Sequence, residues 1–456
     1  MSTPAERRRR GRAARDRVSR SAHGRWIPAA DRPDPLGVLE RQCEDRVAEL
    51  LPIRRGRMAE SPFAYLRGAA AVQAADLGAL PDTGITVQLC GDAHLLNFGV
   101  YASPERALLF DVNDFDETHP GPFEWDVKRL AASVAVAARD NRQDEEQVRR
   151  AALAAVQGYA GAVRRLAGMG ELDVWYARVD TADLPALLRK PGQRRRAEAD
   201  LARARGRTSL QALGKLTEER DGRCRIISAP PLIEPLDRNG LRGIGKVFAD
   251  YRASLPEERR VLLDRYRFVE AATKVVGVGS VGTRCFIVLL EGQGGNDPLF
   301  LQLKEAGRSV LEEHLPPLRA EARVAAEVAA HHGGHRVVTG QHLMQAASDI
   351  FLGWTTGPAG RHFYGRQLRD MKGSTDITAL RPSGLRSYAD LCGRTLARAH
   401  ARTGDRLAIA GYLGRADTFV EAVADFALRY ADRTAADHGD LVAAIADGRL
   451  AATPGV

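Results

Sequence analysis

The chain has 456 residues, 44% of them apolar, so it can bury a substantial core in one large domain or in two to three ordinary ones. No apolar run approaches the roughly 18 residues of a membrane span, and the five cysteines lack the Cys-x-x-Cys spacing of a structural zinc site. Nine arginines against two acids in the first 25 residues carry most of the net charge of +9. We therefore expect a cytoplasmic protein with a disordered basic tail over residues 1–35. The rest of the chain is nearly neutral. Only this tail could contact nucleic acid or anionic lipid.

Helical periodicity follows the tail. It predicts one helix from about Pro35 and a second helix that ends near Leu77. Arg54 and Arg57 lie between these helices. Their guanidinium groups match phosphate or carboxylate oxygens, although surface salt bridges are the simpler interpretation.

The densest polar chemistry lies between Gly91 and Glu117. An apolar strand over 85–90 leads into a turn, and a second strand over 107–110 leads into a cluster of acids. Acids this dense at a strand end need cations, because uncompensated burial costs on the order of several kcal/mol per charge. The turn carries Asp92, His94 and Asn97, and the cluster consists of Asp111, Asp114, Asp116 and Glu117.

The spacing from Asp92 to Asn97 is the D-x-x-x-x-N of kinase catalytic loops. In those loops the Asp orients the acceptor hydroxyl and the Asn holds a magnesium ion. The stretch resembles the loop of aminoglycoside and choline kinases, although Cys90 stands where those families usually carry His. The resemblance implies that Asp92 and Asn97 are catalytic, and that Asn97, Asp114 and Asp116 bind magnesium.

Helices are predicted from Trp125 to about Gly168, in a basic insertion over 190–207, and from Phe248 to Tyr266. A group of strands follows over 270–279, 283–290 and 298–304. Further strands are expected over 337–346 and 350–355, and helices again from Arg381.

A G-x-G-x-x-G lies between the first two of these strands. A dinucleotide-binding loop would open a helix, whereas β-branched and aromatic residues follow here, so that interpretation fails. Strand, glycines, strand, turn and a strand that ends in Lys is the order of a kinase small lobe. Gly277, Gly279, Ser280 and Gly282 would close on the triphosphate, and Lys304 would pair with its inner phosphates.

A helix is predicted over 311–332, where a kinase small lobe carries one. Its carboxylate should pair with Lys304. Glu321 is the first choice by separation, with Glu327 and Glu312 as alternatives.

The order of these parts is unusual, because the catalytic loop precedes the glycine loop by about 180 residues. We expect an α+β, two-lobed, protein-kinase-like fold that is circularly permuted, which is possible when the original termini lie close together at the surface. The helical large lobe would span 36–245 and 358–456. The small β lobe would span 246–357.

From about Asp34 to Leu441 the chain resembles a bacterial family of unknown function, domain of unknown function 2252. The stretches that carry the resemblance are PIRRGRMAESPFAYLRG, CGDAHLLNFG, NDFDETHPGPFEWDVKRLAAS, VVGVGSVGTRCFIVLL, GQHLMQAASDIFLGWT and LARAHARTGD. This resemblance implies a relation to the kinase-like superfamily and supplies no substrate.

The leading hypothesis is an ATP- and magnesium-dependent phosphotransferase that acts on an unidentified small-molecule acceptor. The same site could instead transfer AMP. Asp92-x-His94 after a strand also resembles the first motif of a metallophosphoesterase, but the later motifs of that class are missing. A nucleotide-binding module without catalysis is the fourth alternative, and the joint presence of Asp92, Asn97, Asp114 and Lys304 argues against it.

Overall fold

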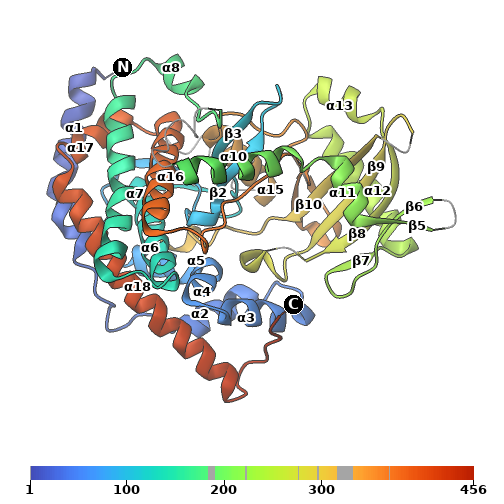
Figure 1. The fold of residues 1–456 in the computed structure, drawn as a ribbon, viewed down its shortest axis with the longest axis horizontal. Helices are drawn as coiled ribbons and strands as arrows, with labels where there is room; N and C mark the ends of the chain where they lie inside the picture. The colour runs from blue at the N-terminus through green and yellow to red at the C-terminus, as the bar shows by residue number, and fades with distance from the viewer. Residues whose placement is uncertain are drawn as a thin grey trace.

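The computed structural model describes residues 2–182, 191–220, 223–275, 277–294, 297–315, 332–368 and 370–455. It combines helices with antiparallel strands, in agreement with the predicted α+β class. Helices gather at one side of the molecule and a six-stranded sheet lies at the other (Figure 1). No helix in the described part of the chain is both long and apolar enough to cross a membrane.

Long helices form the core of the helical side. Small residues let two of them pack closely, since a Cβ on Gly393 would lie 2.0 Å from the Ala155 carbonyl oxygen. Another is buried on all faces from Phe123 to Ala138, as expected of an alanine-rich segment in an interior. These helices are α6 (Phe123–Asp140), α7 (Glu145–Leu166), α16 (Pro382–Thr403) and α18 (Asp417–Ala446).

All strand pairs in the large sheet are antiparallel, and the spatial order is β11, β12, β10, β9, β8, β7. In chain order, α15 (Gly333–Met344) comes between β10 and β11. The strands are β7 (Ile233–Pro235), β8 (Arg267–Lys274), β9 (Cys285–Glu291), β10 (Pro298–Glu305), β11 (Gly353–Thr356) and β12 (His362–Gln367).

The central strand β10 is buried over nearly its whole length, and its two faces have different neighbours. Leu301 and Leu303 belong to the apolar cluster formed with α12 (Arg238–Ala253). Because side chains alternate along a strand, Gln302 and Lys304 lie on the opposite face. That face carries the only polar side chains of β10 that are directed toward the candidate site described below.

The other described elements lie at different distances from the candidate site described below. Near the candidate site lie α2 (Pro35–Cys43), α3 (Leu51–Ala59), α4 (Pro62–Gly68), α5 (Ala70–Gly78), β1 (Thr86–Leu89), β2 (Phe98–Ala102), β3 (Leu108–Val112) and β4 (His119–Pro122). Farther away lie α1 (Pro4–Arg17), α8 (Glu171–Tyr176), α10 (Pro191–Arg205), α11 (Ser209–Leu216), β5 (Thr217–Arg220), β6 (Arg223–Ile226), α13 (Glu257–Leu263) and α17 (Arg406–Leu413). Short 3₁₀ turns are η1 (Arg20–Gly24), η2 (Ala48–Leu50), η3 (Leu95–Asn97), η4 (Val278–Ser280), η5 (Glu312–His314) and η6 (Pro358–Gly360).

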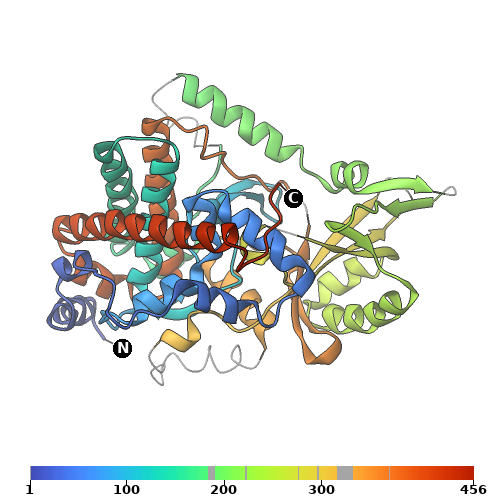
Figure 2. The same ribbon diagram turned by 90° about the horizontal axis from the view of Figure 1, so that it is seen from below.

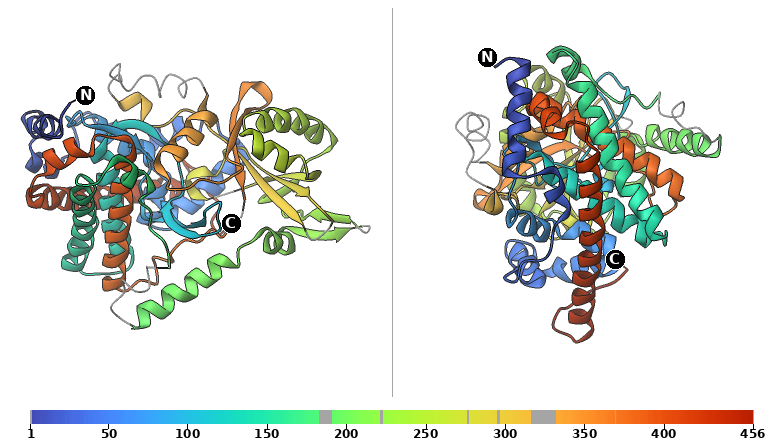
Figure 3. Two further views of the ribbon diagram at one scale, coloured as in Figure 1. Left: turned by 90° about the horizontal axis from the view of Figure 1, so that it is seen from above. Right: turned by 90° about the vertical axis from the view of Figure 1, so that its left-hand side faces the viewer.

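The N-terminal region is ordered, so the prediction of a disordered tail is wrong. Helix α1 lies beside α17 at the far end of the helical side (Figure 3). Arg15 is not solvated but donates from Nε to the Tyr412 carbonyl at 2.9 Å. Trp26 is buried, with its ring centroid 5.0 Å from that of Tyr430. Composition was misleading because these arginines bind carbonyl oxygens and acids of the C-terminal helices.

The C-terminal end also packs on an early part of the chain. The Thr453 N–H donates to the Pro52 carbonyl at 2.8 Å, next to α3. Seen from below, α18 runs across the helical side toward the N-terminal helices (Figure 2). Both ends of the chain therefore pack on the helical side.

Two predictions about the sheet need correction. The segment predicted as a strand over 337–346 is mostly helix α15, because a short apolar run does not distinguish a buried helix from a buried strand. The sheet also begins earlier and ends later than predicted, since it includes β7 and β12. Most of the helix predicted over 311–332 lies outside the described residues.

Candidate functional site

A cavity of about 180 Å³ lies between the sheet and the helical side. Most of the residues predicted to form a site line it, although they come from distant parts of the chain. They are Asp92, Asn97, Asp114, Asp116, Gly277, Gly279, Ser280 and Lys304. Gly282 is not part of the lining. Glu321 lies outside the described residues.

The loop that carries Asp92 is held by a buried carboxylate on α6. The N–H groups of Cys90 and Gly91 donate to Asp126 at 2.8 and 3.1 Å. His400 of α16 contacts the same carboxylate through Nε2 at 3.1 Å. Gly91 is required here, because its φ is +85° and a Cβ would lie 2.1 Å from the Glu117 carbonyl oxygen.

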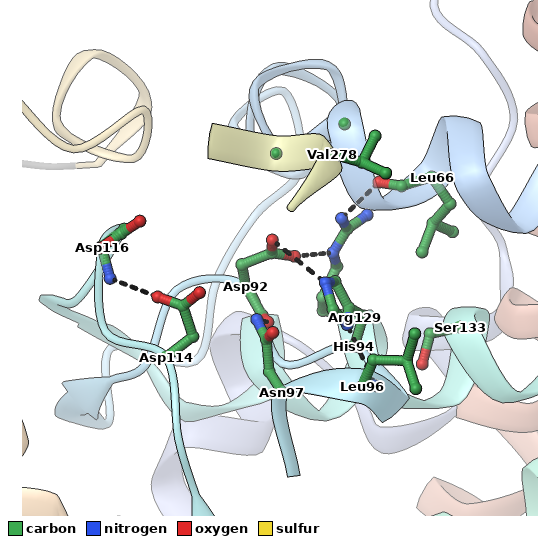
Figure 4. Close-up of polar contacts among 12 residues, drawn as sticks. Leu66, Asp92, His94, Leu96, Asn97, Asp114, Asp116, Arg129, Ser133 and Val278 are labelled. Carbon is green, nitrogen blue, oxygen red and sulfur yellow. Dashed lines mark hydrogen bonds and ion pairs between the residues drawn. The ribbon is translucent and has the colours of Figure 1, made fainter. Parts of the chain in front are cut away.

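Asp92 itself is oriented by an arginine, as Figure 4 shows. The Arg129 Nε donates to Asp92 Oδ1 at 2.7 Å, while its other nitrogens bind Gln73 and the Leu66 carbonyl. The Asn97 side-chain amide donates to the Asp92 carbonyl at 2.6 Å, which closes the turn. Asp92 thus has one fixed carboxylate oxygen, and the Asn97 side-chain oxygen accepts no hydrogen bond from any described residue.

His94 lies beside Asp92 but does not form an ion pair with it. Burial lowers the pKa of His94 to about 4, so the ring is neutral at physiological pH. Its Nδ1 accepts the Leu96 N–H at 3.2 Å, which leaves the proton on Nε2, 3.7 Å from Asp92 Oδ2. His94 therefore stabilises the turn and faces Asp92 as a neutral group.

The two acids of the second motif have different partners. Lys304 Nζ donates to Asp116 Oδ2, and the Tyr364 hydroxyl donates to Oδ1 at 2.8 Å. Burial opposes the charge of Asp116, but Lys304 together with Tyr364 and Arg366 outweighs it and holds the pKa of that carboxyl below its ordinary value. For Asp114, burial and then the charge of Asp116 raise the pKa. Asp114 forms no ion pair with a described residue, and its Oδ1 accepts the Asp116 N–H at 3.2 Å.

Lys304 pairs with Asp116 rather than with any helix glutamate that the structure describes. The alternative Glu312 accepts hydrogen bonds from Arg308 and the Ser309 N–H instead.

A buried arginine of α3 holds the glycine loop in place. Arg54 donates to the carbonyls of Val278 and Gly279 at 3.0 and 2.9 Å, and to the Gly68 carbonyl at 2.8 Å. Arg54 is therefore neither a surface salt bridge nor a phosphate ligand. Its hydrogen bonds attach the loop to α4.

Few side chains of the site could supply oxygen ligands to a metal ion. Within the described ranges no three His, Cys, Asp or Glu side chains are arranged to hold an ion by themselves. Magnesium, however, is usually bound by one or two carboxylates together with substrate phosphates and water. Asp114 and the free oxygen of Asn97, which line the same cavity, fit that limited requirement.

The cavity residues that were not predicted to belong to the site include Arg67 on α4, Gln302 on β10 and Arg366 on β12. Gln302 precedes Lys304 by two residues, so the alternation of β10 could have indicated it. Arg67 and Arg366 gave no signal, because only seven of the 67 basic residues are lysine and arginine is common throughout the chain.

A family model described as "Uncharacterized protein conserved in bacteria (DUF2252)" matches residues 46–444. This range includes every residue that lines the cavity except Gln42 of α2. No curated protein and no solved structure matches the chain.

Proposed function

The chain belongs to the DUF2252 family of bacterial proteins, and we propose that its cavity is the active site of an ATP- and magnesium-dependent phosphotransferase. One observation carries this proposal. Four segments that are separated by up to about 200 residues in sequence line one cavity: the Asp92–Asn97 loop, Asp114 with Asp116, the glycine loop, and Lys304. These are the parts that phosphoryl transfer requires, namely a hydroxyl-orienting Asp, metal ligands and a phosphate cradle with a Lys.

The sheet supports the same proposal. From β8 on, it has in chain order a strand, the glycine loop, two more strands with Lys304 on the second of them, and then helix α15 and a strand pair. This is the order expected for a kinase small lobe. Because the Asp92 loop precedes the sheet, the proposed fold is a circularly permuted relative of kinases, with the helical side as its large lobe.

In the proposed reaction Asp92 accepts a hydrogen bond from the acceptor hydroxyl and takes its proton as the phosphoryl group is transferred. Arg129 keeps the carboxylate oriented, and neutral His94 adds no competing positive charge. Lys304 binds inner phosphate oxygens, for which it must exchange part of its contact with Asp116. Asn97 and Asp114 would hold magnesium, which neutralises charge that develops on the phosphates.

A metallophosphoesterase is less consistent with the same geometry. A two-metal hydrolase needs clusters of protein ligands, and the described residues contain no suitable group. His94 is further occupied at Nδ1 by a backbone N–H.

Turnover of ATP labelled at either the α or the γ phosphate tests the proposal, with a mixture of small metabolites as acceptors. We expect magnesium-dependent transfer of the γ label. Transfer of the α label would instead indicate AMP transfer by this site.

Asp92→Asn is the matched variant, because its side-chain oxygen can still accept from Arg129. It should retain nucleotide affinity and lose turnover, as expected of a group that acts mainly in the transition state. Loss of affinity with turnover intact would contradict the role assigned to Asp92.

A further inference from the structure

Arg67, the penultimate residue of α4, lies in the cavity between the glycine loop and Asp92. Its side chain and Asp92 both line the cavity. A Cβ on Gly277 would lie 3.9 Å from Arg67 Nη2, so the guanidinium closely approaches the start of the loop. Burial lowers the pKa of Arg67, and the negative charge that opposes this most is Asp92.

The hydrogen bonding of Arg67 is incomplete. Its Nε is buried without a partner, and the guanidinium makes no hydrogen bond or ion pair with any described residue. The neighbouring Arg54 and Arg129, by contrast, are bound to carbonyl and side-chain oxygens. Their roles are structural, whereas Arg67 keeps its donors available in a cavity.

The nearby acids do not satisfy Arg67. Asp92 gives one carboxylate oxygen to Arg129, Asp116 is bound by Lys304 and Tyr364, and neither Asp92 nor Asp114 forms an ion pair with Arg67. A half-buried guanidinium with free donors is suited to a bound anion, and its planar fork matches phosphate oxygens. The missing partner is therefore a ligand anion rather than a side chain.

We propose that Arg67 binds the terminal phosphate of the nucleotide, an inference that rests on the proposed function. The position of Arg67 favours the terminal phosphate over the inner phosphates. Asp92 orients the hydroxyl that attacks the terminal phosphorus, and Arg67 lies between Asp92 and the loop that cradles the phosphates. Lys304 approaches from the sheet, beside Asp116, and contacts the inner phosphates. Arg67 thus recognises a triphosphate and stabilises charge on the group that is transferred.

The test compares the affinities for Mg-ATP and Mg-ADP by calorimetry, using the full chain. In wild-type protein ATP should bind more tightly than ADP. Arg67→Ala should weaken ATP binding by about ten- to a hundredfold, the loss typical of a hydrogen bond to a charged group, and leave ADP binding unchanged. Arg67→Lys should restore part of the difference. Arg41→Ala, which removes an exposed arginine outside the cavity, should match wild type.

Thermal unfolding without ligand provides a second readout. Arg67→Ala should unfold at or above the wild-type temperature, because no protein hydrogen bond is lost, whereas Arg54→Ala should unfold at a lower temperature. A large loss of stability in Arg67→Ala would reveal a structural role and overturn the inference. Equal losses for ATP and ADP, or none, would overturn it while leaving the proposed function intact. Absence of nucleotide binding in wild type would contradict both.

Discussion

Asp111 and Asp114 lie three residues apart and have different surroundings. Asp111 is 1% exposed, contacts Arg398, and accepts the N–H groups of Val112 and Ala346, both at 2.9 Å. Asp114 lines the cavity and has no ion-pair partner among the described side chains. Asp111 is therefore a structural carboxylate, and Asp114 is the available metal ligand.

The same substitution at both positions should separate these roles. Asp111→Asn should destabilise the fold by about 3–5 kcal/mol, because it leaves the buried charge of Arg398 uncompensated. Asp114→Asn should leave stability unchanged or increase it, since folding raises the pKa of Asp114, and should abolish magnesium-dependent nucleotide binding. Urea unfolding and calorimetry measure the two effects. Equal or reversed losses would reassign the metal ligand.

Glu117 should make stability depend on pH. Burial raises its pKa from 4.5 to about 7, although Arg336 and the Val310 N–H act in the other direction. The folded state therefore binds this proton more tightly than the unfolded state does. The resulting stabilisation is complete below the unfolded pKa and is lost as the pH rises through the folded pKa.

Glu117→Gln keeps an acceptor for the Val310 N–H and removes the titration. Relative to wild type, the variant should become more stable as the pH rises from about 5 to about 8 in urea unfolding experiments. Parallel pH profiles for the two proteins would show that Glu117 does not titrate in this range.

At the scale of elements, α1 shows how a polar composition can conceal a packed helix. Gly11 faces α17, and a Cβ there would lie 1.9 Å from the Ala408 carbonyl oxygen. Thr3 and Glu6 form a capping box at the start of the helix, with hydrogen bonds of 2.7 and 3.2 Å. Neither the capping box nor the partner surface on α17 was predicted from the sequence.

Gly11→Val should detach α1 from α17, at a cost of about 1–3 kcal/mol for overpacking. Ala13→Val, at an exposed position of the same helix, is the control and should have little effect. Thermal unfolding measures the loss of stability, and trypsin cleavage at the arginines of α1 measures its detachment. Rapid cleavage of α1 in wild type would contradict the packed arrangement.

Helix α15 is a helix in a segment whose sequence predicts a strand. Val337 and Val338 favour a strand, but His332 caps the helix by accepting the His335 N–H at 3.1 Å. Arg336 then attaches the helix to the Asp116 and Thr118 carbonyls at 2.8 and 2.7 Å. Tertiary contacts determine that this segment is a helix. A short apolar run in the sequence gives no information about those contacts.

For the whole molecule, sequence patterns indicated the mixed fold, the strands β8 to β10 and the residues that meet in the cavity. Motif spacing was informative because few backbone geometries bring Asp92, Asn97 and a strand-borne Lys304 to one cavity. The contacts that hold the site loops in place could not be predicted from the sequence. Arg54, Asp126 and His400 act across 36 to 274 residues of sequence, through hydrogen bonds that leave no local pattern.

The wrapping of both chain ends around the helical side was only partly predictable. Helical periodicity assigned the C-terminal helices to that side, whereas charge suggested a free N-terminus. The completed helical side supports the Asp92 loop through α6 and α16, so its integrity should determine whether the cavity is formed at all.

Binding of Mg-ATP tests the central claim most directly. In a thermal-unfolding titration of the full chain, ATP with magnesium at about 100 times its dissociation constant should stabilise the fold by about 2.7 kcal/mol. Omitting magnesium, or substituting Asp114→Asn, should remove most of this stabilisation. If no nucleotide stabilises the wild-type protein in a magnesium-dependent manner, the cavity is not the nucleotide site that we propose.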